Sequence, residues 1–156
     1  MIIRKFTSKD LDDVEEIERE AFKNPYPTSL ILGFWSMYPN CFYVAEFNGR
    51  VVGYILGSMD WGNGHIVSLA VKKEFRGLGI GTALLKTLEN YYFNIANCNY
   101  IVLEVRVSNV VARKFYYKMG YKDRKLLPEY YEDGEDAILM IKKKPNAKGP
   151  LIITLW

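Results

Sequence analysis

The segment Arg76-Gly77-Leu78-Gly79-Ile80-Gly81 places an arginine before three glycines that alternate with apolar residues. This segment lies between a strand-like run and a helix-like run, and glycines at such a place let backbone N–H groups come close to an anion. The dipole of the following helix favours negative charge at this end, and Lys72 and Lys73 add positive charge. The pattern predicts a phosphate or pyrophosphate site, with a purely structural turn as the alternative.

Two common nucleotide-binding motifs do not fit this segment. A Walker A loop requires Gly-Lys-Ser/Thr, and none follows the glycines. Counted from Gly77, the dinucleotide-binding pattern G-x-G-x-x-G requires its third glycine where the chain has Thr82. The predicted phosphate site therefore belongs to neither class.

Glu104 and His65 are the candidates for proton transfer. Glu104 lies inside the apolar run 101–105, where a carboxylate is costly unless it has a partner or a task. An ion pair with Arg106, two residues along on the same strand face, is the alternative interpretation. His65 is the only histidine, and its ordinary pKa of about 6.5 suits a proton relay at neutral pH. A polar residue at the end of a strand is its alternative role.

The periodicity of apolar residues predicts the elements that position these groups. Runs of alternating or β-branched residues predict strands at 1–6, 42–47, 50–59, 65–71, 100–107, 121–126 and 137–141. Apolar residues at helical spacing predict helices at 11–22, from 28 to the break at Pro39, at 83–95, and from the cap at Asn109 to the stop at Gly120. Asn48-Gly49 predicts a tight hairpin between two of the strands.

This order of elements predicts an α/β fold. Hairpins in the first half indicate antiparallel pairs, and two strand–helix–strand stretches in the second half indicate parallel neighbours. We expect a mixed sheet with helices on both faces, formed by one domain at 1–145. The apolar segment 146–156 follows as a tail. Its role as an edge strand or as a dimer contact is left undecided by the sequence.

Composition narrows the class of protein. The chain has 156 residues, of which 49% are hydrophobic and 25% charged, as in an ordinary globular domain. These values exclude a disordered tail, a collagen-like repeat and a small disulfide scaffold. A net charge of +3 suits an anionic small ligand, and no basic stripe with interleaved aromatics indicates nucleic acid.

The remaining signals concern the cellular setting. Cys41 and Cys98 have neither disulfide nor metal-ligand spacing, so we expect two reduced, buried thiols and no metal. The N-terminus is not a secretory signal, and no apolar run approaches the ~20 residues of a membrane span. We therefore expect a cytoplasmic protein that does not enter a membrane.

Several motifs resemble a known family. Arg76-x-x-Gly79-x-Gly81 matches the (Q/R)-x-x-G-x-(G/A) signature of the GCN-related N-acetyltransferases, the GNAT superfamily, which hold the pyrophosphate of acetyl-CoA in this way. The runs 103–109, 115–121, 130–131 and 133–137 resemble RimI-type protein N-terminal acetyltransferases. The strand 65–71 is similar to that of archaeal and eukaryotic N-terminal acetyltransferase catalytic subunits.

The resemblance implies a fold, a co-substrate and roles for individual residues. The implied fold is a central mixed, mostly antiparallel sheet with a splayed parallel pair. The implied co-substrate is acetyl-CoA, and Glu104 corresponds to the general base, His65 to a second residue on the path of the amine, and Tyr116 to the group that protonates the leaving thiolate. The residues implied for binding acetyl-CoA are Leu69, Ala70, Val71, Arg76, Gly77, Leu78, Gly79, Ile80, Gly81, Thr82, Asn109 and Tyr116.

The acceptor implied by the resemblance is the N-terminal α-amine of a protein or peptide, with a ribosomal protein among the candidates. Pro25 and Tyr26 in one loop and Tyr130 and Tyr131 in another are placed to wall a narrow groove, with a solvent-facing loop as the alternative. An α-amine has a pKa of about 8, against about 10.4 for lysine, so a modest base suffices. Neither cysteine lies in a nucleophile motif, so we expect direct transfer.

Other functions remain open at this stage. On the same fold, the acceptor amine could belong to a lysine side chain, a polyamine or another small molecule. A domain that only senses CoA, or one that binds nucleic acid, would be a function of another class. An oligomer formed through the tail is a further expectation.

Overall fold

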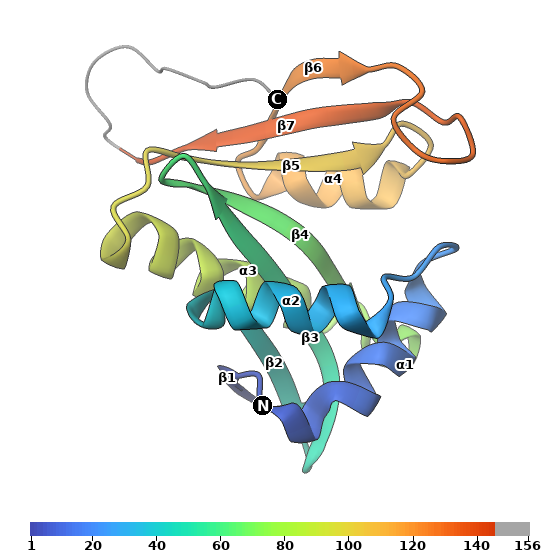
Figure 1. The fold of residues 1–156 in the computed structure, drawn as a ribbon, viewed down its shortest axis with the longest axis vertical. Helices are drawn as coiled ribbons and strands as arrows, with labels where there is room; N and C mark the ends of the chain where they lie inside the picture. Colours follow the sequence, from blue (N-terminus) through green and yellow to red (C-terminus); the bar gives the residue numbers. More distant parts are fainter. Residues whose placement is uncertain (146–156) are drawn as a thin grey trace.

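The computed structural model describes residues 1–145 (Figure 1). Its strands are β1 (Ile2–Lys5), β2 (Phe42–Phe47), β3 (Arg50–Asp60), β4 (Asn63–Val71), β5 (Tyr100–Arg106), β6 (Lys122–Leu127) and β7 (Ala137–Lys143). Its helices are α1 (Leu11–Ala21), α2 (Thr28–Met37), α3 (Ile80–Asn90), which continues into a π-helical turn (Tyr91–Ile95), and α4 (Val110–Lys118). The predicted tail 146–156 lies outside the described residues.

The strands form one seven-stranded sheet in the order β1-β2-β3-β4-β5-β7-β6. Among the strands of residues 1–145, only β4 and β5 are parallel neighbours, and the other pairs are antiparallel. The mixed, mostly antiparallel sheet predicted from the sequence is thus confirmed. The β2–β3 hairpin turns at Asn48 and Gly49, whose φ angles of 50° and 76° are the reason for this residue pair.

One expected pairing is wrong. The second strand–helix–strand stretch predicted β5 and β6 as parallel neighbours, but β7 lies between them and pairs antiparallel with both. Burial explains the order, because five successive residues of β7 are buried whereas most of β6 is exposed. The charged run Lys122-Asp123-Arg124-Lys125 suits an edge strand, which must not pair further.

Helices cover both faces of the sheet, as predicted (Figure 1). On one face α1 and α2 bury Val14, Ile17 and Ile31 against alternate residues of β2 and β3. On the other face α3 buries Leu84 and Leu88, and α4 packs against the same core. Two hydrophobic layers therefore hold the sheet from either side.

The parallel pair is short, and it opens. Backbone partners of β4 and β5 are confined to Gly64 with Ile101 and His65 with Val102, after which the strands diverge (Figure 1). At the start of β4 the Tyr92 ring packs against Gly64, where an added Cβ would come within 2.6 Å of the ring. Because the pairing with β5 ends at His65, the backbone edge of β4 beyond this residue borders an opening between the two strands.

A buried polar cluster joins α3 to β7. Glu89 accepts hydrogen bonds from the Tyr121 hydroxyl at 2.8 Å and from Lys142 Nζ at 3.1 Å. Glu89→Ala leaves both donors without this acceptor, so we expect a loss of about 2–3 kcal/mol in the free energy of unfolding. Urea denaturation measures it, with the exposed Glu74→Ala as a control that changes stability by less than about 0.5 kcal/mol. Equal stabilities of the two variants would contradict this role.

Within residues 1–145, no helix has both the length and the apolar character needed to cross a membrane. Cys41 and Cys98 are buried free thiols, as the sequence predicted.

Candidate active site

The Glu104 carboxylate and the His65 imidazole meet across the parallel pair. His65 Nε2 lies 2.9 Å from Glu104 Oε1 and 3.0 Å from Oε2. The other ring nitrogen, Nδ1, lies 3.4 Å from Asp60 Oδ2 and 3.5 Å from Ser58 Oγ. Arg106 binds other carboxylates, so the alternative Glu104–Arg106 ion pair is not formed. The two residues predicted for proton transfer form one hydrogen-bonded pair.

The charge of His65 depends on opposing effects. Burial lowers the pKa of His65, but the hydrogen bond and negative charge of Glu104, together with the charge of Asp60, outweigh burial and raise the pKa above its usual value of about 6.5. The imidazole is therefore held as a cation to higher pH than a free histidine. The cationic imidazole attracts the neighbouring Glu104 carboxylate, so the two side chains form an ion pair.

This raised pKa predicts a pH-dependent stability. The stabilisation is complete below the unfolded pKa of about 6.5 and is lost as the pH rises through the raised folded pKa. We expect His65→Gln to lower the melting temperature most below pH 6.5 and progressively less at higher pH. Melting curves of the wild type and the variant across pH 5.5–9 measure this. A constant difference over that range would contradict a charged His65.

A cavity of about 550 Å³ opens in front of Glu104. All four residues predicted for the acceptor groove line it: Pro25, Tyr26, Tyr130 and Tyr131. Glu104 lines it as well, whereas His65 is not among the lining residues and contacts Glu104 instead. The Tyr130 hydroxyl donates a hydrogen bond to Glu104 Oε1 at 3.1 Å, a contact that the sequence did not indicate.

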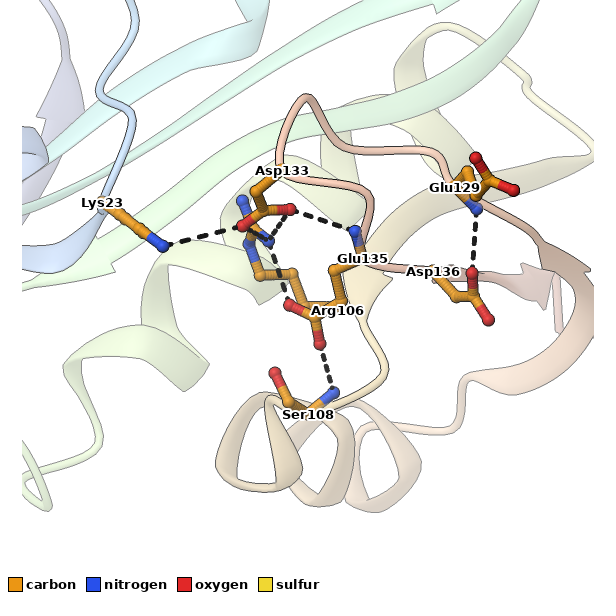
Figure 2. Close-up of polar contacts among 7 residues, drawn as sticks. All are labelled: Lys23, Arg106, Ser108, Glu129, Asp133, Glu135 and Asp136. Atoms are coloured by element: carbon orange, nitrogen blue, oxygen red, sulfur yellow. Dashed lines mark hydrogen bonds and ion pairs between the residues drawn. The ribbon is translucent and has the colours of Figure 1, made fainter.

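Arg106 holds the loop that carries the two tyrosines. Its guanidinium binds Asp133 at 2.9 Å and Glu135 at 3.0 Å (Figure 2). It also lies 4.0 Å from the centre of the Tyr131 ring. Glu135 also accepts from the backbone N–H of Ser108 at 2.9 Å, which ties the same loop to the start of α4. Sequence reasoning missed this role, although the acidic run 132–135 after the tyrosines was a signal for it.

Glu18 is a second residue that sequence reasoning missed. Its side chain lies in α1, is almost completely buried and is among the residues lining the cavity. The signal was its spacing, because position 18 shares the apolar stripe of Val14, Ile17 and Ala21 instead of the polar face.

The glycine segment forms the turn into α3 that the sequence predicted. Gly77 and Gly79 have φ angles of 78° and 82°, which only glycine adopts without strain, and a Cβ on either would meet nothing within 4 Å. Gly79 is the N-cap of α3 and offers no side chain to the first N–H groups of the helix. These N–H groups are thus available to an anion in open space.

The cations near this turn have different partners. Arg76 lies beside the turn, where its Nε donates to the carbonyl of Val71 at 2.9 Å. Lys72, which we expected to add charge here, is buried and lies 3.5 Å from Glu16 of α1. Lys72 is therefore engaged elsewhere, and the groups at this turn that suit a phosphate are the backbone N–H groups and Arg76.

A second cavity of about 580 Å³ runs from this turn along the end of β4 to α4. Every residue predicted to bind acetyl-CoA lines it except Leu78, which points to solvent. Leu69, Asn109 and Tyr116 line both cavities, so the two spaces adjoin at these residues. An uncapped helix start, an open strand edge and a continuous space suit a long ligand with a diphosphate, as acetyl-CoA is.

Asn109 and Tyr116 mark the junction of the cavities. Asn109 Oδ1 caps α4 by accepting from the Ala112 N–H at 3.1 Å, which leaves its side-chain NH₂ group for a ligand. Tyr116 packs edge-on against Phe115 and Tyr121, and none of the described residues hydrogen-bonds its hydroxyl. Burial raises the pKa of Tyr116, so its phenol stays protonated and able to donate.

The chain belongs to the acetyltransferase (GNAT) family, because the sequence model of this family matches residues 11–121. It is 92% identical over 156 residues to the "uncharacterized N-acetyltransferase" of Methanocaldococcus jannaschii, and the match covers 100% of both chains. It is 41% identical over 150 residues to the N-alpha-acetyltransferase of Sulfurisphaera tokodaii, covering 88% of this chain and 90% of that one. The chain is therefore an acetyl-CoA-dependent N-acetyltransferase.

Solved structures agree with this assignment. Ard1 from Thermoplasma volcanium superposes with a TM-score of 0.87 at 34% identity, over 91% of this chain and 96% of that one. The ribosomal-protein-S18-alanine N-acetyltransferase of Escherichia coli superposes with a TM-score of 0.84 at 24% identity, over 97% and 99% of the chains. The second similarity concerns the fold alone.

Proposed function

We propose that this protein transfers the acetyl group of acetyl-CoA to the N-terminal α-amine of a protein or peptide. The observation that carries the proposal is the cavity in which Glu104 is walled by Tyr26, Tyr130 and Tyr131 and which adjoins the acetyl-CoA cavity at Tyr116. A narrow aromatic wall admits the flexible end of a chain more readily than a side chain flanked by backbone on both sides. The N-alpha-acetyltransferase of Sulfurisphaera tokodaii supports the same acceptor.

The chain's own residues supply the proton transfers. Glu104, held by His65 and Tyr130, accepts a proton from the bound ammonium group, either directly or through one water. The neutral amine then attacks the thioester carbonyl that acetyl-CoA supplies when bound. Tyr116, whose phenol stays protonated at the junction of the cavities, gives its hydroxyl proton to the departing thiolate sulfur. The attacking nitrogen releases its second proton as the amide forms, and this proton restores the Tyr116 phenol. The acetyl group thus passes to the amine without a covalent enzyme intermediate.

A ribosomal protein is a proposed acceptor within this class. The Escherichia coli enzyme that shares the fold is named as an acetyltransferase of ribosomal protein S18. We place the reaction in the cytoplasm, because two buried free thiols suit a reducing compartment.

A panel of matched peptides tests the proposed acceptor. Each peptide sequence is supplied with a free or a chemically blocked N-terminus and contains one internal lysine, and mass spectrometry locates the acetyl group. We expect acetylation of the free α-amine and none of the blocked peptides. Acetylation of the internal lysine in blocked peptides at a comparable rate would instead assign the enzyme to lysine side chains.

A further inference from the structure

Glu18 carries a buried carboxylate that the proposed proton transfers do not use. Its exposed fraction is 2%. Oε1 accepts a hydrogen bond from Ser68 Oγ at 2.8 Å and another from the Tyr54 hydroxyl. Oε2 accepts from the backbone N–H of Tyr26 at 2.8 Å. One carboxylate therefore connects α1, β3 and β4 to the loop that walls the acceptor cavity.

This arrangement is costly for stability alone. Among residues 1–145 no cation forms an ion pair with Glu18, and all three of its donors are neutral. Burying a charge without a cation costs free energy, and an apolar side chain of similar size is often as stable. A role beyond stability is therefore expected, and the Tyr26 contact indicates what it is.

The loop 22–27 has few other restraints. It has no regular secondary structure, and α2 begins after Pro27 without a side-chain cap. Its other polar side-chain contacts lie at the surface, where Lys23 Nζ is 3.9 Å from Asp133 (Figure 2) and where Thr28, just beyond the loop, meets Glu15. Exposed contacts of this kind contribute little. Among residues 1–145, the Glu18 contact is thus the hydrogen bond that fixes the Tyr26 backbone from the protein interior.

We propose that Glu18 is a positioning residue for the acceptor, holding the Tyr26 wall of the cavity at the distance from Glu104 that a chain terminus requires. This inference rests on the proposed function. Burial raises the pKa of the Tyr26 phenol, and the negative charges of Glu18 and Glu104 raise it further. The Tyr26 side chain is therefore close enough to both carboxylates to interact with their charges. Glu18 therefore acts through Tyr26 on the acceptor, and has no contact with the acetyl-CoA cavity.

The role predicts a split between the two substrates. Glu18→Leu keeps the volume but removes the acceptor for the Tyr26 N–H, so we expect the KM for the peptide to rise about tenfold, as loss of one hydrogen bond to a charged group implies. The KM for acetyl-CoA should stay within about twofold. Glu18→Gln should rescue the peptide KM, because its amide oxygen can accept from Tyr26 while its NH₂ group donates to the two hydroxyls.

A matched control separates positioning from stability. Tyr54→Phe removes a donor to the same carboxylate but leaves the Tyr26 contact, so it should lower the melting temperature with an unchanged peptide KM. Should Glu18→Leu not fold, Glu18→Asp serves, because it keeps the charge and is one methylene too short to reach Tyr26. Its peptide KM should rise likewise.

Two results would overturn the proposal. One is a peptide KM within twofold of the wild type in the folded Leu or Asp variant, and the other is an equal rise in both KM values. The measurement uses whichever amine the wild-type enzyme acetylates. If that amine is an internal lysine, the proposed function fails, whereas Glu18 is still judged by the KM for that peptide.

Discussion

Replacing Glu104 with glutamine is expected to lower kcat/KM for the peptide by about 10²–10³-fold at pH 7, as loss of a general base does. Glutamine keeps the size of the side chain and can still hydrogen-bond His65 and Tyr130, but it cannot take up the proton of the ammonium group. The deficit should shrink toward pH 9, because an α-amine with a pKa of about 8 is then neutral without help.

Initial rates across pH 6–9 measure this effect. Glu74→Gln is the matched control, since this carboxylate is exposed and lies outside both cavities. Its rate should equal that of the wild type at every pH. A Glu104→Gln enzyme with unchanged rates over this range would remove Glu104 from the role of base.

Replacing Tyr116 with phenylalanine is expected to lower kcat by about 10²-fold while the affinity for acetyl-CoA changes by less than about twofold. The phenyl ring keeps the edge-on contacts with Phe115 and Tyr121, so the junction of the cavities retains its shape. Only the hydroxyl proton is lost, and with it the donor for the departing sulfur.

Steady-state kinetics and direct titration with CoA separate the two quantities. Tyr121→Phe is the control, because it removes a hydroxyl bound to Glu89 instead of one that borders the cavities. It should lose stability but retain kcat. A Tyr116→Phe enzyme with normal kcat and weakened CoA binding would make Tyr116 a binding residue instead of a proton donor.

The parts of the site that depend on local sequence could be predicted. The turn at Gly77 and Gly79 requires positive φ angles that few other residues adopt, so the glycines themselves indicate the conformation. Asn48-Gly49 indicates the hairpin for the same reason. The motif resemblance then supplied the association of these local features with acetyl-CoA.

Long-range contacts could not be predicted in this way. Glu104 and Arg106 share a strand face, yet Glu104 meets His65 from the neighbouring strand and Arg106 meets Asp133 and Glu135 from a loop. The position of β7 between β5 and β6 depends on which strand is buried on both faces, which is a property of the assembled sheet. Sequence spacing carries no direct record of such neighbours.

Glu18 shows the limit most clearly. Its place on the apolar stripe of α1 marks it as unusual, but its three donors come from two strands and one loop. Their convergence requires the tertiary structure. The sequence could therefore identify the residue as unusual without identifying what it holds.

A crystal structure with CoA joined through an acetyl group to the α-nitrogen of a peptide tests the central claim most directly. We expect the diphosphate to lie within hydrogen-bond distance of the backbone N–H groups of residues 77–82, and the α-nitrogen to reach Glu104 directly or through one water. A diphosphate bound away from the glycine turn, or an α-nitrogen on the far side of the cavity from Glu104, would contradict the account.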